Sequence, residues 1–284
     1  MELLQDCPRC QKPIVPKLSY CKACGLPLNK KSLARLALQQ QAGTRGDDAA
    51  AGQDYLSAFS YPLRGSGLSL LVVGSLCFGI AGMLPMGGLM SLLITGYMAA
   101  YMFKIINETA IGNLEPAEWP GFTNIFDDIL IPLFQYVFVH IICFVPMILS
   151  LYVGVGMTGL ENLVNGELGG LIGTLLLSGL LGLGGLAYLP LALLSVALNN
   201  SVLGVHPGIV FRLMAHLGKE YLIVLGVLFL SVLLNVWLQG LLGGIPFVGG
   251  LIASGVGLYT TMVYSHILGL IYYRHQASLR ATPT

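Results

Sequence analysis

Hydrophobic and polar positions change their balance about one fifth of the way along the chain. Residues up to Asp54 are largely polar, whereas Gly65 to Tyr273 are mostly apolar, with charges confined to short breaks. Apolar stretches of about 20 residues recur here, and a helix of that length crosses the hydrocarbon core of a bilayer. The pattern predicts an all-α integral membrane protein with six transmembrane helices, which we place near 66–84, 87–106, 129–154, 169–198, 221–242 and 248–272.

The composition supports a membrane as the solvent of this second part. Only 10% of the 284 residues are charged and 55% are hydrophobic, whereas a soluble domain carries about 25% charged residues. The amino-terminal segment contains no apolar region of the kind that a secretory signal needs. We therefore expect the amino terminus to lie in the cytoplasm.

The positions of the charges agree with this orientation. With the amino terminus inside, the inner loops and the carboxyl terminus hold Arg64, Lys104, Arg212, Lys219, Arg274 and Arg280. The outer loops contain no Lys or Arg, only Glu161 and Glu167. An excess of basic residues on the cytoplasmic side is the usual determinant of topology. Six spans with both termini in the cytoplasm satisfy this rule, and one span more or fewer would break it.

Four cysteines form two closely spaced pairs near the amino terminus, namely Cys7, Cys10, Cys21 and Cys24. In a reducing compartment such pairs favour a metal over a disulfide or a redox site. Zinc binds four thiolates in a tetrahedral arrangement. We predict a structural Zn²⁺, whose binding supplies the folding energy that so short a segment cannot obtain from a core. Cys77 and Cys143 fall in predicted spans, where we expect packing roles.

These features divide the chain into three regions. Residues 1–29 are the predicted zinc ribbon. Residues 30–60 are a short helix followed by a flexible tether, because 43–54 (GTRGDDAAAGQD) is rich in Gly and Ala, and by an interfacial segment with aromatic residues from Tyr55 onwards. Residues 61–284 are the six-span membrane domain.

Side chains that can do chemistry are few in the predicted spans. The polar ones are Gln135, His140, Asn235, Gln239 and His266. An ionisable group at membrane depth is a functional candidate. Alternatively, His140 bonds a backbone group that Pro146 frees or one on a neighbouring helix, and His266 contacts headgroups near the inner end of its span. No span carries Asp, Glu, Lys or Arg near its centre, which argues against a proton-coupled or ion-coupled transporter.

Asp127 and Asp128 lie at the entrance to the third predicted span. They are candidates for binding a cation or starting a proton path. The alternative is that both carboxylates begin a helix, where they match the positive end of its dipole. We favour the second interpretation.

Two further patterns bear on packing. Gly169-x3-Gly173 and Gly250-x3-Ser254 allow helix backbones to approach closely, and we expect this packing inside the protein, with a homo-oligomer face as the alternative. Trp119-Pro-Gly-Phe122 and His206-Pro-Gly-Ile209 precede amphipathic stretches, at 122–130 and 209–221. They indicate either a weak internal duplication or two helices that both start with Pro-Gly.

An ordered series of short motifs runs through the membrane domain: Tyr61-Pro-Leu-Arg64, Gly96-Tyr97, Glu118-Trp-Pro-Gly-Phe122 and Phe126-Asp-Asp128. Over 61–273 it resembles a family of prokaryotic integral membrane proteins classed as a domain of unknown function. Here two residues stand between Pro116 and Trp119, where the family has one. The resemblance implies helical spans in a bacterial or archaeal plasma (inner) membrane, and it implies no activity and no catalytic residue.

We expect a non-enzymatic membrane protein, an adaptor or assembly factor whose zinc ribbon engages a protein partner. The alternative is a transporter, channel or lipid-handling protein, and an enzyme would need acids, bases or metal ligands gathered at one face. Membrane lipid is an expected partner. The basic amino-terminal segment could also attract nucleic acid, but no recognition helix follows the cysteines, so we do not expect that partner.

Overall fold

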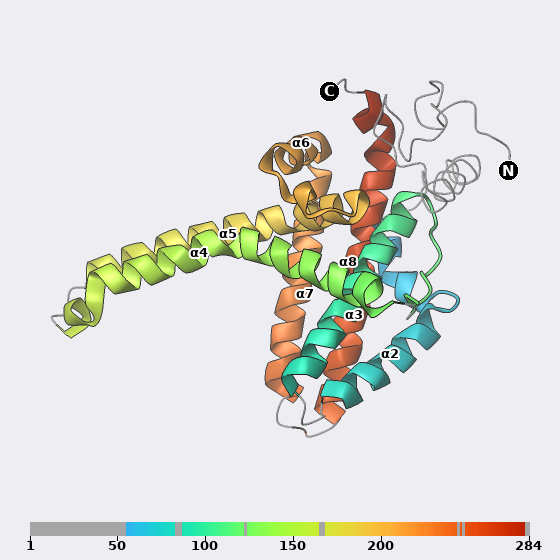
Figure 1. The fold of residues 1–284 in the computed structure, drawn as a ribbon, viewed down its shortest axis with the longest axis horizontal. Coiled ribbons are helices and arrows are strands. Elements are labelled where there is room, and N and C mark those ends of the chain that lie inside the picture. The colour runs from blue at the N-terminus through green and yellow to red at the C-terminus, as the bar shows by residue number, and fades with distance from the viewer. Residues whose placement is uncertain are drawn as a thin grey trace. The chain divides into compact units, whose positions relative to one another are not determined.

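The computed structural model of the chain describes residues 55–82, 87–121, 124–164, 168–242, 245 and 248–281. In this part 89% of the residues are helical and there is no strand. The predicted zinc ribbon and tether lie outside it. Asp54–Ala110 and Leu114–Thr284 form one compact unit, the helical unit. The elements are η1 (Tyr55–Leu63), α2 (Gly67–Gly82), α3 (Gly87–Ala110), η2 (Phe126–Leu130), α4 (Ile131–Val164), α5 (Leu168–Asn199), η3 (Val202–Val205), α6 (Pro207–Leu217), α7 (Glu220–Leu242) and α8 (Val248–Ala281) (Figure 1).

Each predicted span coincides with a helix, and the all-helical class is confirmed for the described residues. Four helical stretches there are long and apolar enough to cross a membrane: Phe126–Gly156, Gly169–Asn199, Glu220–Leu242 and Val248–His275. A fifth arises if η1 and α2, which meet at a bend of 66°, count as one broken span. These helices indicate a membrane-embedded protein.

The first two predicted spans differ from the others in length or charge. Helix α2 has 16 residues, and at about 1.5 Å per residue it is about 24 Å long, less than the hydrocarbon core of about 30 Å. Helix α3 has 24 residues, but its last turns carry Lys104 and Glu108. The two ions lie 3.8 Å apart on neighbouring turns. The apolar part of α3 is therefore shorter than the helix itself.

Helix α8 forms the core of the helical unit. Every residue from Met262 to Ile271 is buried, and α8 packs against α2, α3, α7 and η1. The contact with α3 is close because Gly269 has no side chain. A Cβ atom at Gly269 would lie 2.8 Å from the backbone oxygen of Ile106 and 2.5 Å from the Cβ of Thr109. Small residues thus allow the backbones of α3 and α8 to approach.

Helices α4 and α5 form an antiparallel hairpin and lie side by side (Figure 1). Gly182 and Gly185 face α4, where added Cβ atoms would lie 2.8 Å from the sulfur of Met147 and 2.4 Å from the backbone oxygen of Cys143. Pro190 stays inside the uninterrupted α5. Large apolar side chains on the outer faces of the hairpin, such as Tyr152 and Leu176, are exposed. Such surfaces suit contact with lipid tails.

The expectation that Gly169-x3-Gly173 packs inside the protein is wrong. Added Cβ atoms at both glycines would meet nothing within 4 Å, and both residues are exposed. In the second motif Gly250 is also exposed, and the Ser254 hydroxyl donates to the Gly250 backbone oxygen of its own helix. The spacing shows that one face of a helix carries small side chains, but it does not show which neighbour that face contacts.

The two Pro-Gly segments lead to different structures. His206 caps α6, its Nδ1 accepting a hydrogen bond from the Gly208 N–H at 3.2 Å, and α6 ends at Gly218, whose φ is +52°. The predicted stretch after residue 122 contains η2, which continues directly into α4. Only α6 is a separate amphipathic helix in the described part of the chain. The alternative in which Pro-Gly simply starts a helix describes α6 well.

Two neighbouring glycines in α5 give a matched test of the hairpin. We expect Gly185→Ala to lower the stability of the protein by about 1–3 kcal/mol, because its methyl group would push against the α4 backbone. Gly184→Ala is the control, since nothing lies within 4 Å of that position and alanine favours a helix. Thermal unfolding of both variants in detergent measures the difference. Equal unfolding temperatures would contradict the packing described.

Candidate functional site

The loop between α3 and η2 is fastened to the helical unit through the backbone of Ala117. The Tyr61 hydroxyl accepts the Ala117 N–H at 3.0 Å, and the Tyr101 hydroxyl donates to the Ala117 carbonyl at 3.1 Å. Lys104 Nζ donates to the carbonyl of Glu118 at 2.8 Å. Ala117 is only 1% exposed, so the two bonds to Ala117 satisfy backbone groups that water does not reach.

Trp119 continues this attachment through its ring. The indole stacks on Tyr97 and Tyr101, with ring centroids 5.4 Å and 5.2 Å away, and meets the edge of Phe78 at 5.9 Å. Gly74 lies against it, since a Cβ atom there would be 2.6 Å from the indole. The sequence motifs that contain Tyr61, Tyr97 and Trp119 therefore meet in space. We call Tyr61, Tyr97, Tyr101 and Trp119, with the attached loop, the aromatic clamp.

His266 lies beside the clamp. It is fully buried, its ring stacks on Tyr61 at 4.0 Å, and its Nδ1 lies 3.0 Å from the Thr109 hydroxyl. The expected headgroup contact is wrong, because this side chain has no exposed surface. Nε2 has no hydrogen-bond partner among the described residues. His266 thus joins α8 to α3 and η1.

A second cluster gathers polar and charged side chains from η1, α6, α7 and α8. The Tyr55 hydroxyl donates to the Glu220 carboxylate, the Arg274 guanidinium lies 4.5 Å from the centre of the Tyr55 ring, and His275 Nε2 lies 3.9 Å from Glu220 Oε1. His216 adds an edge-on ring contact to His275 at 6.2 Å. We call this the inner-end cluster, because the charge pattern predicts that this end of α7 and α8 faces the cytoplasm. Sequence reasoning missed it, because no motif links Tyr55 to a residue 165 positions away.

The polar groups predicted at membrane depth mostly bond their own helices. His140 Nδ1 lies 2.8 Å from the carbonyl of Tyr136, one turn earlier. This carbonyl belongs to the same helix, so His140 bonds neither a backbone group freed by Pro146 nor one on a neighbouring helix, and that alternative is wrong. Asn235 donates to the carbonyl of Ser231 at 2.9 Å and lies 3.4 Å from the Thr260 hydroxyl. Gln135 is buried, and the Gln239 side chain lies outside the described residues.

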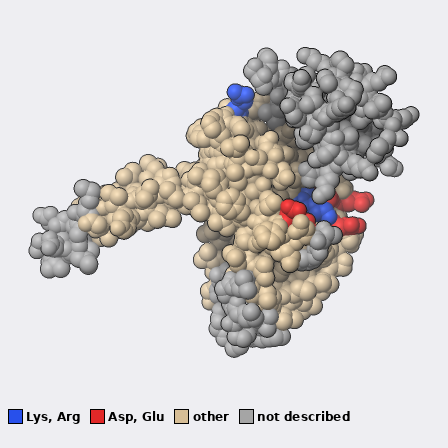
Figure 2. Space-filling view, viewed as in Figure 1, with Lys and Arg blue, Asp and Glu red and all other residues tan. Residues whose placement is uncertain are grey.

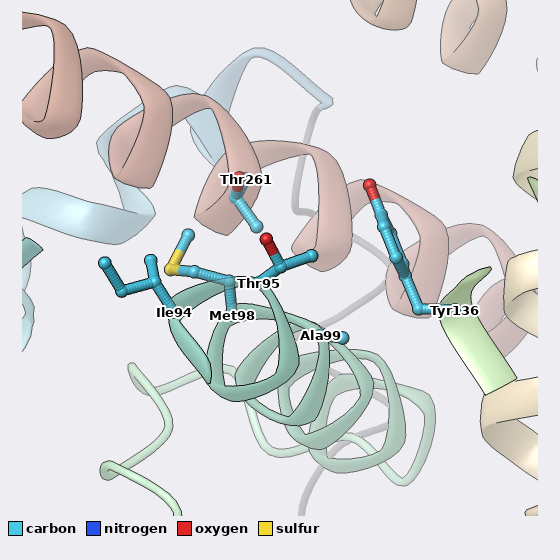
Figure 3. A pocket seen from close by; sticks show the side chains of 6 residues that line it. All are labelled: Ile94, Thr95, Met98, Ala99, Tyr136 and Thr261. Atoms are coloured by element: carbon cyan, nitrogen blue, oxygen red, sulfur yellow. The ribbon is translucent and has the colours of Figure 1, made fainter. Parts of the chain in front are cut away.

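A small cavity lies where α3, α4 and α8 meet (Figure 3). Its volume is about 240 Å³, and its lining residues are Ile94, Thr95, Met98, Ala99, Tyr136 and Thr261. Three of these residues, one from each helix, carry hydroxyl groups, and no lining residue is charged. The hydroxyls of Thr95 and Thr261 donate to carbonyls of their own helices at 2.8 Å. Toward a ligand they can therefore act only as hydrogen-bond acceptors. Neither His140 nor Asn235 contributes to this cavity.

Asp127 and Asp128 act at a helix start, as we favoured. The Asn124 N–H donates to Asp128 Oδ2 at 2.9 Å, and the Asn124 side-chain amide donates to Asp127 Oδ2 at 2.8 Å. Asn124 Oδ1 in turn accepts the N–H of Phe126 at 3.1 Å. The two carboxylates thus lie in the first turn and hold Asn124, whose side chain accepts a backbone N–H of that turn.

No group of three or more metal-ligating side chains occurs among the residues that the structure describes. The predicted zinc ligands Cys7, Cys10, Cys21 and Cys24 lie outside them, so the Zn²⁺ site stays a prediction. Of the remaining cysteines Cys143 is buried, while Cys77 is exposed on the short α2. The packing role predicted for Cys77 is therefore wrong within the described chain, and a lipid-facing position on α2 fits its exposure.

Comparisons with known proteins give no assignment. No family model, no curated protein and no solved structure matches the chain. The site is therefore interpreted from its own geometry.

The aromatic clamp makes a specific prediction for Tyr61. Tyr61→Phe keeps the ring stacked on His266 but leaves the buried Ala117 N–H without an acceptor, which costs about 1–3 kcal/mol. We expect a lower unfolding temperature in detergent. We also expect the fluorescence of Trp119 to change at a lower temperature than the helical content does. Tyr152→Phe is the control, because its side chain is 79% exposed. A Tyr61→Phe protein as stable as the control would show that this hydrogen bond does not hold the loop.

Proposed function

We propose that this protein is a non-enzymatic, membrane-anchored adaptor or assembly factor. Its six-span domain lies in a prokaryotic plasma membrane with both termini in the cytoplasm. A zinc ribbon, with Cys7, Cys10, Cys21 and Cys24 as ligands of a structural Zn²⁺, presents a surface to a soluble protein partner. The membrane domain supplies the anchor.

The observation that carries this proposal is the inner-end cluster. Tyr55 is the first described residue after the predicted tether, and it is fixed by Glu220 and Arg274 from α7 and α8. A flexible chain of about 12 residues has a root-mean-square span of about 20 Å. A ribbon on such a tether, starting from a fixed point, stays close to one membrane face and still reaches partners there.

The use of polar groups in the spans also supports an anchor. His140 and Asn235 bond backbone carbonyls of their own helices, and the Thr109 hydroxyl and His266 bond each other. A transport path at membrane depth needs polar groups that face a shared cavity. His140 and Asn235 instead bond within their helices, and His266 joins α8 to α3.

A second function, handling of a lipid or another uncharged molecule, rests on the cavity of Figure 3. Its hydroxyl groups suit a neutral ligand that forms hydrogen bonds, and its residues Thr95 and Thr261 lie near the middle of their helices. The cavity of about 240 Å³ is smaller than the pockets of about 300–1,000 Å³ that hold typical small ligands. We therefore rank this function second.

Co-purification tests the adaptor function. We expect Cys21→Ser/Cys24→Ser to remove about one zinc per chain, because two of four ligands are lost, and to remove a specific soluble partner from the purified membrane protein. Elemental and proteomic mass spectrometry measure the two effects at matched abundance.

Cys77→Ser serves as the control, since Cys77 lies on α2 and outside the predicted ribbon. Loss of zinc with an unchanged set of partners would count against the adaptor and would favour the cavity. An unchanged zinc content would contradict the ligand assignment itself.

A further inference from the structure

Helix α6 has one buried face and one exposed face. Val210 and Leu217 point into the unit and are buried. Phe211, Arg212 and Ala215 are exposed, and their spacing places them on one side of the helix. Phe211 is 58% exposed although it contacts the ring of Tyr188 at an edge. The outer face therefore combines a large apolar ring with a cation.

Apolar exposure continues on both sides of α6. Leu203 in η3 is 78% exposed, and Leu222 in the first turn of α7 is 65% exposed. Further along α7, Phe229 and Leu230 are also exposed, on a helix apolar enough to cross a membrane. The exposed apolar side chains of α6 are thus continuous along the chain with a surface that suits lipid tails.

Two cations accompany this apolar surface. Arg212 on α6 and Lys219 in the following turn are exposed, and neither forms an ion pair within the described residues. The nearest acid in sequence, Glu220, bonds Tyr55 and lies near His275. Figure 2 shows basic atoms over α6, while the acidic atoms visible in that view lie over another part of the surface. The local charge is therefore positive.

We propose that α6 is an interfacial helix that binds anionic phospholipids of the cytoplasmic leaflet. Leu203, Phe211 and Leu222 enter the acyl boundary, and Arg212 and Lys219 bind the phosphate groups. Helices with apolar and basic side chains on an exposed face lie in this way at membrane surfaces. The proposal rests on the membrane orientation proposed above, and it does not depend on the zinc ribbon or its partner.

The apolar surface favours lipid over a soluble acidic protein. An acidic protein would match Arg212 and Lys219, but it would not require exposed side chains as large as Phe211 and Leu222. The end of α6 also lies next to the start of α7, separated only by Gly218 and Lys219. A headgroup bound at Lys219 would therefore sit where a membrane-crossing helix begins.

The test uses the full-length protein in mixed micelles of a neutral detergent with phosphatidylglycerol or phosphatidylcholine. The unfolding temperature is measured as the phosphatidylglycerol fraction of the micelles increases. The fraction at which the stabilisation is half complete reports the affinity for this lipid. We expect Arg212→Gln/Lys219→Gln to raise that fraction about tenfold, because each cation near the surface contributes to anion binding. Arg212→Lys/Lys219→Arg is the matched control, since it keeps both charges and should bind as the wild type does.

Two further arms decide what is bound. Phe211→Ser should weaken phosphatidylglycerol binding, and glycerol 3-phosphate should neither stabilise the wild type nor compete with the lipid. Equal phosphatidylglycerol binding by Arg212→Gln/Lys219→Gln and by Arg212→Lys/Lys219→Arg would overturn the proposal. Phosphatidylcholine that stabilises the wild type as much as phosphatidylglycerol does would overturn it too. Stabilisation by glycerol 3-phosphate would assign Arg212 and Lys219 to a soluble anion and would also overturn it. If Arg212→Gln/Lys219→Gln does not fold, the Phe211→Ser variant and the glycerol 3-phosphate measurement decide whether the proposal stands.

Discussion

The structure depends on the burial of α8. Met262 to Ile271 are buried on all sides, so α2, α3, α7 and η1 must surround this helix. In a bilayer, lipid tails are as apolar as the side chains, and close packing and hydrogen bonds hold helices together in place of the hydrophobic effect. Gly269 provides the close approach to α3, and the bond between Thr109 and His266 provides the polar link.

The aromatic clamp and the inner-end cluster both build on this helix. Tyr61 stacks on His266 of α8 and at the same time accepts the N–H of Ala117, so the loop, η1 and α8 form one connected network. Several turns later, Arg274 and His275 of α8 meet Tyr55 and Glu220. Two attachments on one buried helix fix both ends of η1, and with it the point at which the tether begins.

The sequence predicted the helices better than it predicted their contacts. The span placed at 169–198 matches Leu168–Asn199, and 221–242 matches Glu220–Leu242, because long apolar runs end at polar loops. Periodicity could not reveal that Gly185 faces α4 while Gly169 faces open space. It could not pair Tyr55 with Glu220 either, because that contact depends on how distant helices are arranged. His266 was misplaced for the same reason, since its burial comes from η1 and α3.

The six-span topology is the claim on which the proposed anchor, ribbon orientation and lipid surface all rest. Labelling of single added cysteines with a membrane-impermeant maleimide, in right-side-out membrane vesicles, tests it most directly. The six-span topology predicts that Glu167→Cys is labelled in sealed vesicles, that Glu118→Cys is labelled only after the vesicles are opened, and that the wild type stays unlabelled while sealed. Labelling of Glu118→Cys in sealed vesicles, or protection of Glu167→Cys there, would contradict this topology.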